Sequence, residues 1–231
     1  MLLVNEIFES ISGEYSGIIP QGTVCNFIRF QGCNLKCGYC DTVKTQTTSG
    51  AVYSARSAYE LHEYVKNPKL PLIITGGEPL MYQEYIPQLI KVLSNGIAAI
   101  ETNGSIAIPD IFFTDSISVI IDRKVPSSGM HKKMIPMSRL LCGLKKANQK
   151  NYIHLKYVFT SYHDIGRDIN WMVEDVCTIL QAGFIHGGNI IVSATPENLR
   201  ILYDRRDQYA CVSKMFNVVY QIQLHKLLGL A

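Results

Sequence analysis

Short apolar runs alternate with amphipathic segments along this 231-residue chain. The runs are rich in β-branched residues, which is typical of buried strands. They cover residues 24–30, 71–75, 97–100, 116–122, 153–160 and 189–193, with a further short run at 218–220. The segments between them predict helices at 57–66, 85–94, 164–182 and 196–209. Strands that alternate with helices predict an α/β fold with a mostly parallel sheet.

Unusual residues follow several of the predicted strands. A cysteine-rich loop follows residues 24–30, Gly-Gly-Glu follows 71–75, and the polar segments 101–104 and 122–124 follow the next two strands. In open parallel sheets, ligands bind outside the carboxyl ends of the strands. The sequence therefore predicts that these segments converge on one ligand site.

Composition excludes several classes of protein. The net charge of +3 is spread along the chain without a dense run of Lys or Arg, so we expect no nucleic-acid partner. No apolar run approaches the roughly 18 residues of a membrane span, and the start lacks the pattern of a signal peptide. We therefore expect a cytoplasmic protein without a membrane partner. Seven cysteines, an odd number, argue against a disulfide framework.

Three of these cysteines lie within eight residues, with the spacing C-x3-C-x2-C at Cys33, Cys37 and Cys40. Thiolates suit zinc or iron–sulfur clusters. A structural zinc site needs four ligands, and no second Cys pair follows; His62 stands alone. A cubane cluster normally takes four cysteines, so three would leave one iron open to an outside ligand. The alternative is three buried thiols, which is how we interpret the isolated cysteines 25, 142, 177 and 211.

The cysteine loop, with Tyr39 before its third Cys, resembles that of the radical S-adenosylmethionine superfamily. The resemblance extends to Thr75-Gly76-Gly77-Glu78-Pro79. It implies a [4Fe–4S] cluster whose open iron is chelated by S-adenosylmethionine, and a 5′-deoxyadenosyl radical formed by one-electron cleavage. The two glycines would let the backbone approach the methionine part, and Glu78 would pair with its ammonium group.

A closer resemblance, over nearly the whole chain, is to the 7-carboxy-7-deazaguanine synthase family. It rests on residues 6–14, 27–30, 33–35, 40–42, 75–79, 101–105 and 224–231. The resemblance implies conversion of 6-carboxy-5,6,7,8-tetrahydropterin to 7-carboxy-7-deazaguanine plus ammonia, in 7-deazapurine and queuosine biosynthesis. It also implies Mg²⁺, an electron donor such as flavodoxin or ferredoxin, and a homodimer. Because a full barrel takes about 250 residues, we expect a partial, open β/α barrel of about six parallel strands. It would form one domain over 1–231, with the cluster loop at 32–42 and a tail at 217–231 that completes the substrate site.

The resemblance also implies roles for individual residues. Arg29, Glu14 and Thr75 would act on the substrate, with Arg29 forking onto its carboxylate. The other substrate contacts would be Ile11, Ser12, Gly13, His225 and the terminal carboxylate of Ala231. Thr42 would be a magnesium ligand beside the three cluster cysteines; its alternative role is a helix N-cap. The cofactor would contact Gly38, Tyr39, Cys40, Asp41, Gly76, Gly77, Glu78, Glu101, Asn103, Asp122, Arg123, Lys124, Ala194, Thr195, Pro196 and Glu197.

Three departures from the family pattern stand out. Ser12-Gly13-Glu14-Tyr15 replaces Gln-Gly-Glu-Gly, Asp122-Arg123-Lys124 replaces Ser-Pro-Lys, and the tail ends in Ala where Pro is usual. Two other functions stay open at this point. One is an activating enzyme that makes a glycyl radical on a partner protein, and the other is a non-catalytic iron–sulfur or zinc module that binds a protein.

Overall fold

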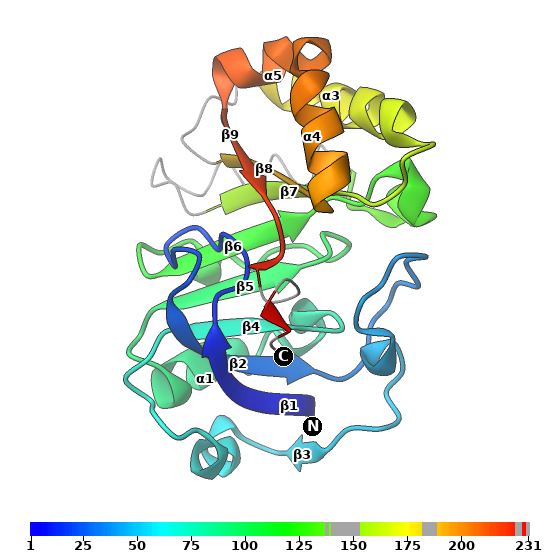
Figure 1. Ribbon diagram of the computed structural model, residues 1–231. Coiled ribbons are helices and arrows are strands. Elements are labelled where there is room, and N and C mark those ends of the chain that lie inside the picture. The colour runs from blue at the N-terminus through cyan, green and yellow to red at the C-terminus, as the bar shows by residue number, and fades with distance from the viewer. Residues whose placement is uncertain (137–138, 140–152, 182–188, 225–227, 230–231) are drawn as a thin grey trace.

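The computed structural model describes residues 1–136, 139, 153–181, 189–224 and 228–229. Within them the chain forms one sheet of nine strands in the order β3-β1-β2-β4-β5-β6-β7-β8-β9 (Figure 1). The strands are β1 (Leu2–Ile11), β2 (Val24–Phe30), β3 (Tyr53–Ala55), β4 (Leu72–Gly76), β5 (Ala98–Thr102), β6 (Ile117–Asp122), β7 (Ile153–Phe159), β8 (Asn189–Ala194) and β9 (Asn217–Gln221). From β2 to β9 all neighbours are parallel, whereas β1 pairs antiparallel with both β2 and β3.

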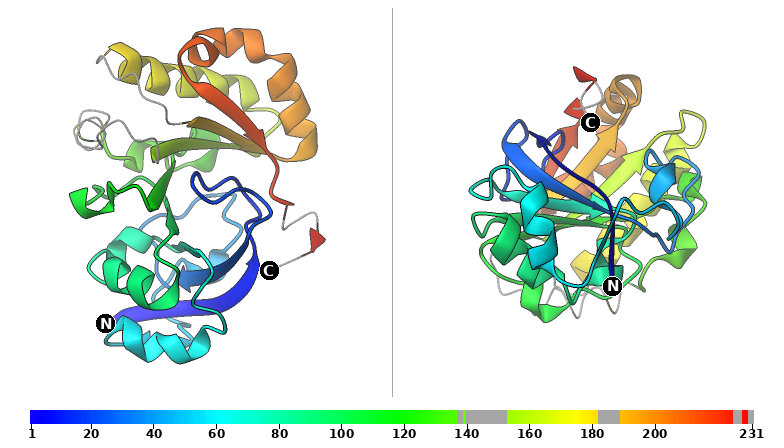
Figure 2. Two further views of the ribbon diagram at one scale, coloured as in Figure 1. Left: turned by 90° about the vertical axis from the view of Figure 1, so that its left-hand side faces the viewer. Right: turned by 90° about the horizontal axis from the view of Figure 1, so that it is seen from below.

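Four α-helices accompany this sheet in the described residues: α1 (Ile86–Leu93), α3 (Ile165–Gln181), α4 (Pro196–Asp204) and α5 (Ala210–Met215). Pro196 occupies the first turn of α4, where its missing N–H costs no hydrogen bond, and the Thr195 hydroxyl caps the helix by accepting from the Asn198 N–H. Helices α3, α4 and α5 gather at the end of the sheet formed by β7–β9, and α1 lies toward the other end (Figures 1 and 2). No helix in these residues is long and apolar enough to cross a membrane.

The two faces of the sheet differ because successive side chains of a strand point to opposite sides. On one face, residues such as Ile74, Ile100 and Tyr157 are fully buried in the main core with α1 and α3. The opposite face carries a small apolar cluster of Ile19, Cys25, Ile73 and Ala99 toward the amino ends of the strands. Polar residues follow on that same face toward the carboxyl ends. On this face, apolar side chains therefore fill the space at the amino ends of the strands, and polar side chains surround a pocket at their carboxyl ends.

The expected open, mostly parallel α/β sheet is confirmed. Seven strands run parallel where about six were expected, and β1 and β3 were not predicted. Residues 57–66, expected as a helix, form the 3₁₀ segment Ala58–Tyr64. The helix predicted over 196–209 ends at Asp204 and is followed by a 3₁₀ turn, Arg206–Tyr209, that leads into α5.

Candidate functional site

One pocket opens at the carboxyl ends of β2 and β4–β7. Its walls bring together most of the residues predicted to form the site. The predicted residues that line it are Ile11, Ser12, Gly13, Glu14, Arg29, Cys33, Cys37, Tyr39, Cys40, Asp41, Thr42, Thr75, Gly76, Gly77, Glu101, Asn103, Asp122 and Lys124. Segments far apart in the sequence thus meet where a parallel sheet binds ligands.

The three loop cysteines lie in the pocket wall as partly buried free thiols. Two N–H groups point at the sulfur of Cys33, from Leu35 at 3.4 Å and from the Asn103 side chain at 3.7 Å. Burial raises the pKa of the Cys33 and Cys37 thiols, and the charge of Lys124 opposes this rise at Cys37. Soft sulfur donors that need a neighbouring positive charge fit the iron atoms of a cluster.

A single metal ion fits the loop less well. Among the described residues, no group of three His, Cys, Asp or Glu side chains is placed to hold one ion. In a cubane each thiolate binds a different iron, so the three sulfurs need not converge on one point. The three cysteines in the pocket wall are compatible with such a cluster.

The Gly-Gly-Glu segment holds the cysteine loop in place. The Gly77 N–H donates to the Phe30 carbonyl at 3.0 Å, and the Glu78 N–H donates to the Gly32 carbonyl at 2.9 Å. Gly76 has a φ of +113°, and a Cβ on either glycine would overlap the backbone of Phe30 or Gly32. The packing of the chain itself therefore requires both glycines, whether or not a cofactor also approaches the backbone here.

Glu78 lies beneath the pocket and is fully buried. Its carboxylate accepts hydrogen bonds from the Leu80 N–H, the Thr102 hydroxyl and the Asn103 N–H, at 2.7–2.8 Å. Burial raises its pKa, and these three donors oppose the rise. In this structure Glu78 ties the end of β4 to the end of β5, and it does not belong to the pocket wall.

Arg29 projects from β2 into the pocket. Its guanidinium lies 3.5 Å from the Glu6 carboxylate and 5.3 Å from the centre of the Phe8 ring, while Lys44 also pairs with Glu6. The buried Nε of Arg29 has no hydrogen-bond partner among the described residues. A guanidinium in the pocket wall is suited to bind an anion.

A second charged group forms around Glu14, whose side chain is 9% exposed. Its carboxylate pairs with Lys156 of β7 and accepts hydrogen bonds from Gln221 at 3.1 Å and from Gln223. The Gln221 side chain also accepts from the Tyr15 N–H at 2.8 Å, and the Leu224 N–H donates to the Gly13 carbonyl at 2.8 Å. Segments 12–15 and 221–224 therefore hold each other in the pocket wall.

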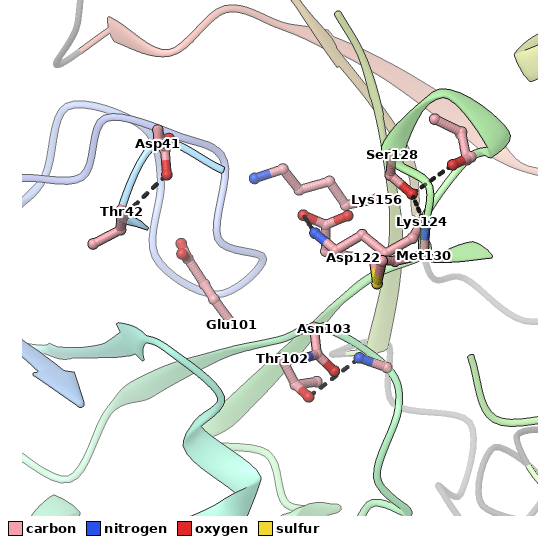
Figure 3. A network of polar contacts seen from close by, with 12 residues as sticks. Asp41, Thr42, Glu101, Thr102, Asn103, Asp122, Lys124, Ser128, Met130 and Lys156 are labelled. Atoms are coloured by element: carbon pink, nitrogen blue, oxygen red, sulfur yellow. Dashed lines mark hydrogen bonds and ion pairs between the residues drawn. The ribbon is translucent and has the colours of Figure 1, made fainter. Parts of the chain in front are cut away.

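Glu101 and Thr75 form the floor between these two charged groups. The Thr75 hydroxyl donates to the Glu101 carboxylate at 3.0 Å. Burial, reinforced by the negative charge of Glu14, raises the pKa of Glu101 to about 7, although Lys156 opposes the rise. Figure 3 shows Glu101, Asp41 and Lys156 pointing toward a common space.

On the remaining side, Lys124 pairs with Asp122 at 2.9 Å and lies 5.7 Å from the centre of the Tyr39 ring (Figure 3). The Thr42 hydroxyl donates to Asp41 at 3.0 Å and makes no N-cap hydrogen bond to the turn that follows. The alternative role of Thr42 as a helix cap is therefore not supported, and Thr42 lines the pocket.

Several predicted contacts lie elsewhere. Arg123 points away from the pocket and forms a double hydrogen bond with Asp175 of α3. The pocket wall, as far as the described residues define it, also excludes Gly38 and the four residues Ala194, Thr195, Pro196 and Glu197 at the β8–α4 junction. His225 and Ala231 lie outside the described residues. Their cofactor or substrate contacts stay predictions.

Sequence reasoning missed Lys156, Phe27 and Gln223, which all line the pocket. A signal for Lys156 was present. In β7, Leu155, Tyr157 and Phe159 are buried in the main core, so the alternating positions His154, Lys156 and Val158 face the interior.

Comparison with known proteins agrees with this site. The family model of the Radical SAM superfamily matches residues 27–114, which contain the cysteine loop and Gly76-Gly77-Glu78. Fold and site together define a radical S-adenosylmethionine protein.

Whole-chain relatives are more specific. A 7-carboxy-7-deazaguanine synthase of Clostridium acetobutylicum is 32% identical over 97% of this chain and 95% of its own length. Proteins of the same name from Methanospirillum hungatei and Aquifex aeolicus are 32% and 33% identical, over 65% and 61% of this chain and 60% and 64% of their own lengths. The chain belongs to the 7-carboxy-7-deazaguanine synthase family.

Proposed function

We propose that the protein converts 6-carboxy-5,6,7,8-tetrahydropterin to 7-carboxy-7-deazaguanine with release of ammonia, in 7-deazapurine and queuosine biosynthesis. One observation carries the proposal: Cys33, Cys37 and Cys40 line the same pocket as Arg29 and Glu14. The name shared by the relatives supports the reaction. A glycyl-radical activating enzyme or a non-catalytic module would not need the polar groups that surround the interior of this pocket.

The three cysteines would hold the [4Fe–4S] cluster, and S-adenosylmethionine would lie against the loop at Tyr39–Asp41, Gly77 and the Asp122–Lys124 pair. When bound, these groups supply the one-electron chemistry that removes a hydrogen atom from the substrate. The apolar cluster beneath the pocket, which includes Ile73 and Ala99, keeps water from the closed end of the site.

Arg29 would bind the substrate carboxylate. Glu6 and Phe8 contact its guanidinium, and its Nε has no hydrogen-bond partner among the described residues, so the group has donors that Glu6 does not use. Thr75 and Glu101 would contact the middle of the ring system. With a pKa near 7, Glu101 can hold or release a proton close to neutral pH.

The proposal also includes a metal ion, a second subunit and an electron donor. Thr42, beside Asp41, would contribute a hard oxygen to Mg²⁺, with substrate and water completing the shell. The site would lie in one catalytic domain of a cytoplasmic homodimer whose second subunit covers an open edge of the sheet. A flavodoxin or ferredoxin would supply the electron.

Anaerobic reconstitution with iron and sulfide tests the proposal. We expect about four irons per chain in the wild type and in the control variant Cys211→Ala, whose thiol is exposed and outside the pocket. Cys37→Ala should lose both the iron and the turnover. With carboxytetrahydropterin, S-adenosylmethionine and dithionite, the wild type should form the deazaguanine chromophore. Cleavage of S-adenosylmethionine without that product would contradict the proposed substrate.

A further inference from the structure

Lys156 is a buried cation of the pocket to which the proposed function gives no role. The described part of the pocket wall contains Arg29, Lys124 and Lys156 as its cationic side chains. Arg29 is paired with Glu6 and Lys124 with Asp122, and both belong to the proposed substrate and cofactor sites. Lys156 is paired with Glu14, and its side chain is only 9% exposed.

Burying such a pair is costly. Removing two charges from water requires several kcal/mol, which a buried ion pair often fails to recover relative to an apolar pair of the same size. Lys156 also lies within electrostatic reach of Glu101 and Asp122. An ammonium group has three N–H donors, and Glu14 takes one of them. Figure 3 shows the ammonium group directed away from Lys124 and Asp122, toward the side of the site where Asp41 and Glu101 lie.

The position of the Lys156–Glu14 pair relative to Arg29 indicates which part of the substrate the pair would contact. Arg29 lies on β2 and Lys156 on β7, and the strands β4, β5 and β6 lie between them in the sheet. The two groups therefore stand on opposite walls of the pocket. A carboxylated pterin is a flat bicyclic molecule with its carboxylate at one end and a 2-amino-4-oxopyrimidine edge at the other. A molecule held by Arg29 at one end would direct this edge toward Lys156.

We propose that Lys156 is a specificity-determining residue that donates a hydrogen bond to the 4-oxo oxygen of the substrate, while Glu14 beside it accepts from the adjacent ring N–H and amino group. This inference rests on the proposed function. The pair offers a donor next to an acceptor, which is the complement of an amino-oxo edge. Gln221 and Gln223 hold the Glu14 carboxylate from the tail, so its direction is fixed before the substrate arrives.

The test compares binding of two unreactive, fluorescent ligands to the reconstituted enzyme with S-adenosylmethionine. One is oxidised 6-carboxypterin, and the other is 2,4-diaminopteridine-6-carboxylate, which presents an amino group in place of the 4-oxo oxygen. The wild type should prefer the 4-oxo ligand, because the amino group would face the ammonium donor. Lys156→Met should bind the 4-oxo ligand about tenfold to a hundredfold more weakly, as expected for the loss of a charged hydrogen bond. Its affinity for the diamino ligand should change much less.

Lys66→Met, at an exposed lysine outside the pocket, is the control and should keep the wild-type preference. Because Lys156→Met leaves Glu14 without its cation, the double variant Glu14→Gln/Lys156→Met is measured as well, and it should also lose the preference. Equal weakening of both ligands in the two variants, or an unchanged preference, would overturn the inference.

The outcomes separate this inference from the proposed reaction. If the wild type forms product but Lys156→Met keeps the preference for the 4-oxo ligand, only this inference is wrong. If the wild type forms no product but binds 6-carboxypterin more tightly than Lys156→Met does, the proposed reaction is wrong and this inference is supported.

Discussion

Gly77 lies so close to Gly32 that a single methyl group at position 77 would overlap the Gly32 carbonyl. The same Gly32 accepts the Glu78 N–H and donates its own N–H to the Thr45 carbonyl at 2.9 Å. The backbone entering the cysteine loop is therefore clamped between the end of β4 and Thr45, directly before Cys33. The position of the first cysteine depends on this clamp.

Gly77→Ala should displace the start of the cysteine loop. We expect the variant to lose about 1–3 kcal/mol of stability through overpacking and to bind less iron after reconstitution. Gly166→Ala, on α3, is the control, because its added Cβ would meet only the Arg205 side chain at an ordinary 3.6 Å and alanine favours a helix. Urea denaturation and iron analysis measure the two effects. Full iron content in Gly77→Ala would show that the clamp does not position the loop.

Arg123 should matter more for stability than for cofactor binding. It pairs with Asp175 at 2.7 and 2.8 Å, and the two side chains are 4% and 8% exposed. Arg123→Met leaves a buried unpaired carboxylate, so we expect a loss of about 3–5 kcal/mol. Arg167→Met, which breaks an exposed pair with Asp164, should change stability little. Unchanged stability together with weaker S-adenosylmethionine binding would instead support the cofactor contact predicted from the sequence.

Gln221 should affect substrate binding although it belongs to the last strand. Its side chain joins the Tyr15 N–H to the Glu14 carboxylate. Gln221→Met breaks both hydrogen bonds, and the loss of about 1–2 kcal/mol of positioning should raise KM roughly tenfold with a smaller change in kcat. Steady-state kinetics of this variant and of Gln208→Met, at an exposed glutamine, provide the measurement. A KM equal to that of the wild type would argue against coupling between the tail and segment 12–15.

Glu101 should make stability depend on pH. Burial raises its pKa from 4.5 to about 7. A raised carboxyl pKa contributes stability that is fully present below pH 4.5 and is lost as the pH rises to about 7. The expected size is about 3 kcal/mol. The stability of Glu101→Gln relative to the wild type should therefore increase over this interval.

Denaturation in urea at several pH values tests this difference. Glu84→Gln, at an exposed carboxylate, is the matched control and should keep a constant offset from the wild type. The same constant offset for Glu101→Gln would mean that Glu101 titrates as an ordinary carboxyl group.

The sequence was informative where strands are buried on both faces. Such strands are nearly continuous apolar runs, so β6 and β8 were predicted to within one residue at each end. Strand β1 was missed because polar residues such as Glu6 and Ser10 interrupt its apolar positions. Glu6 serves Arg29 and Lys44, and a sequence pattern cannot reveal partners that lie on other elements.

The sequence predicted which strand ends form the site. It predicted less well the direction in which each side chain points. Asp122 and Lys124 face the pocket while Arg123 between them faces α3, so the alternation of β6 continues for two residues past its end. Glu78 turns under the floor of the pocket because the Thr102 hydroxyl and the Asn103 N–H, at the end of β5, donate hydrogen bonds to its carboxylate. Both outcomes depend on neighbours that are remote in sequence, and motif spacing carries no information about them.

Because Tyr15 and Gln221 are 206 positions apart yet share a hydrogen bond in the pocket wall, this wall cannot assemble early in synthesis. A ribosome would have to deliver residues 221–224 before the segment that begins with Ser12 found its partners. During translation the cysteine loop would therefore emerge long before the opposite wall of the pocket could form.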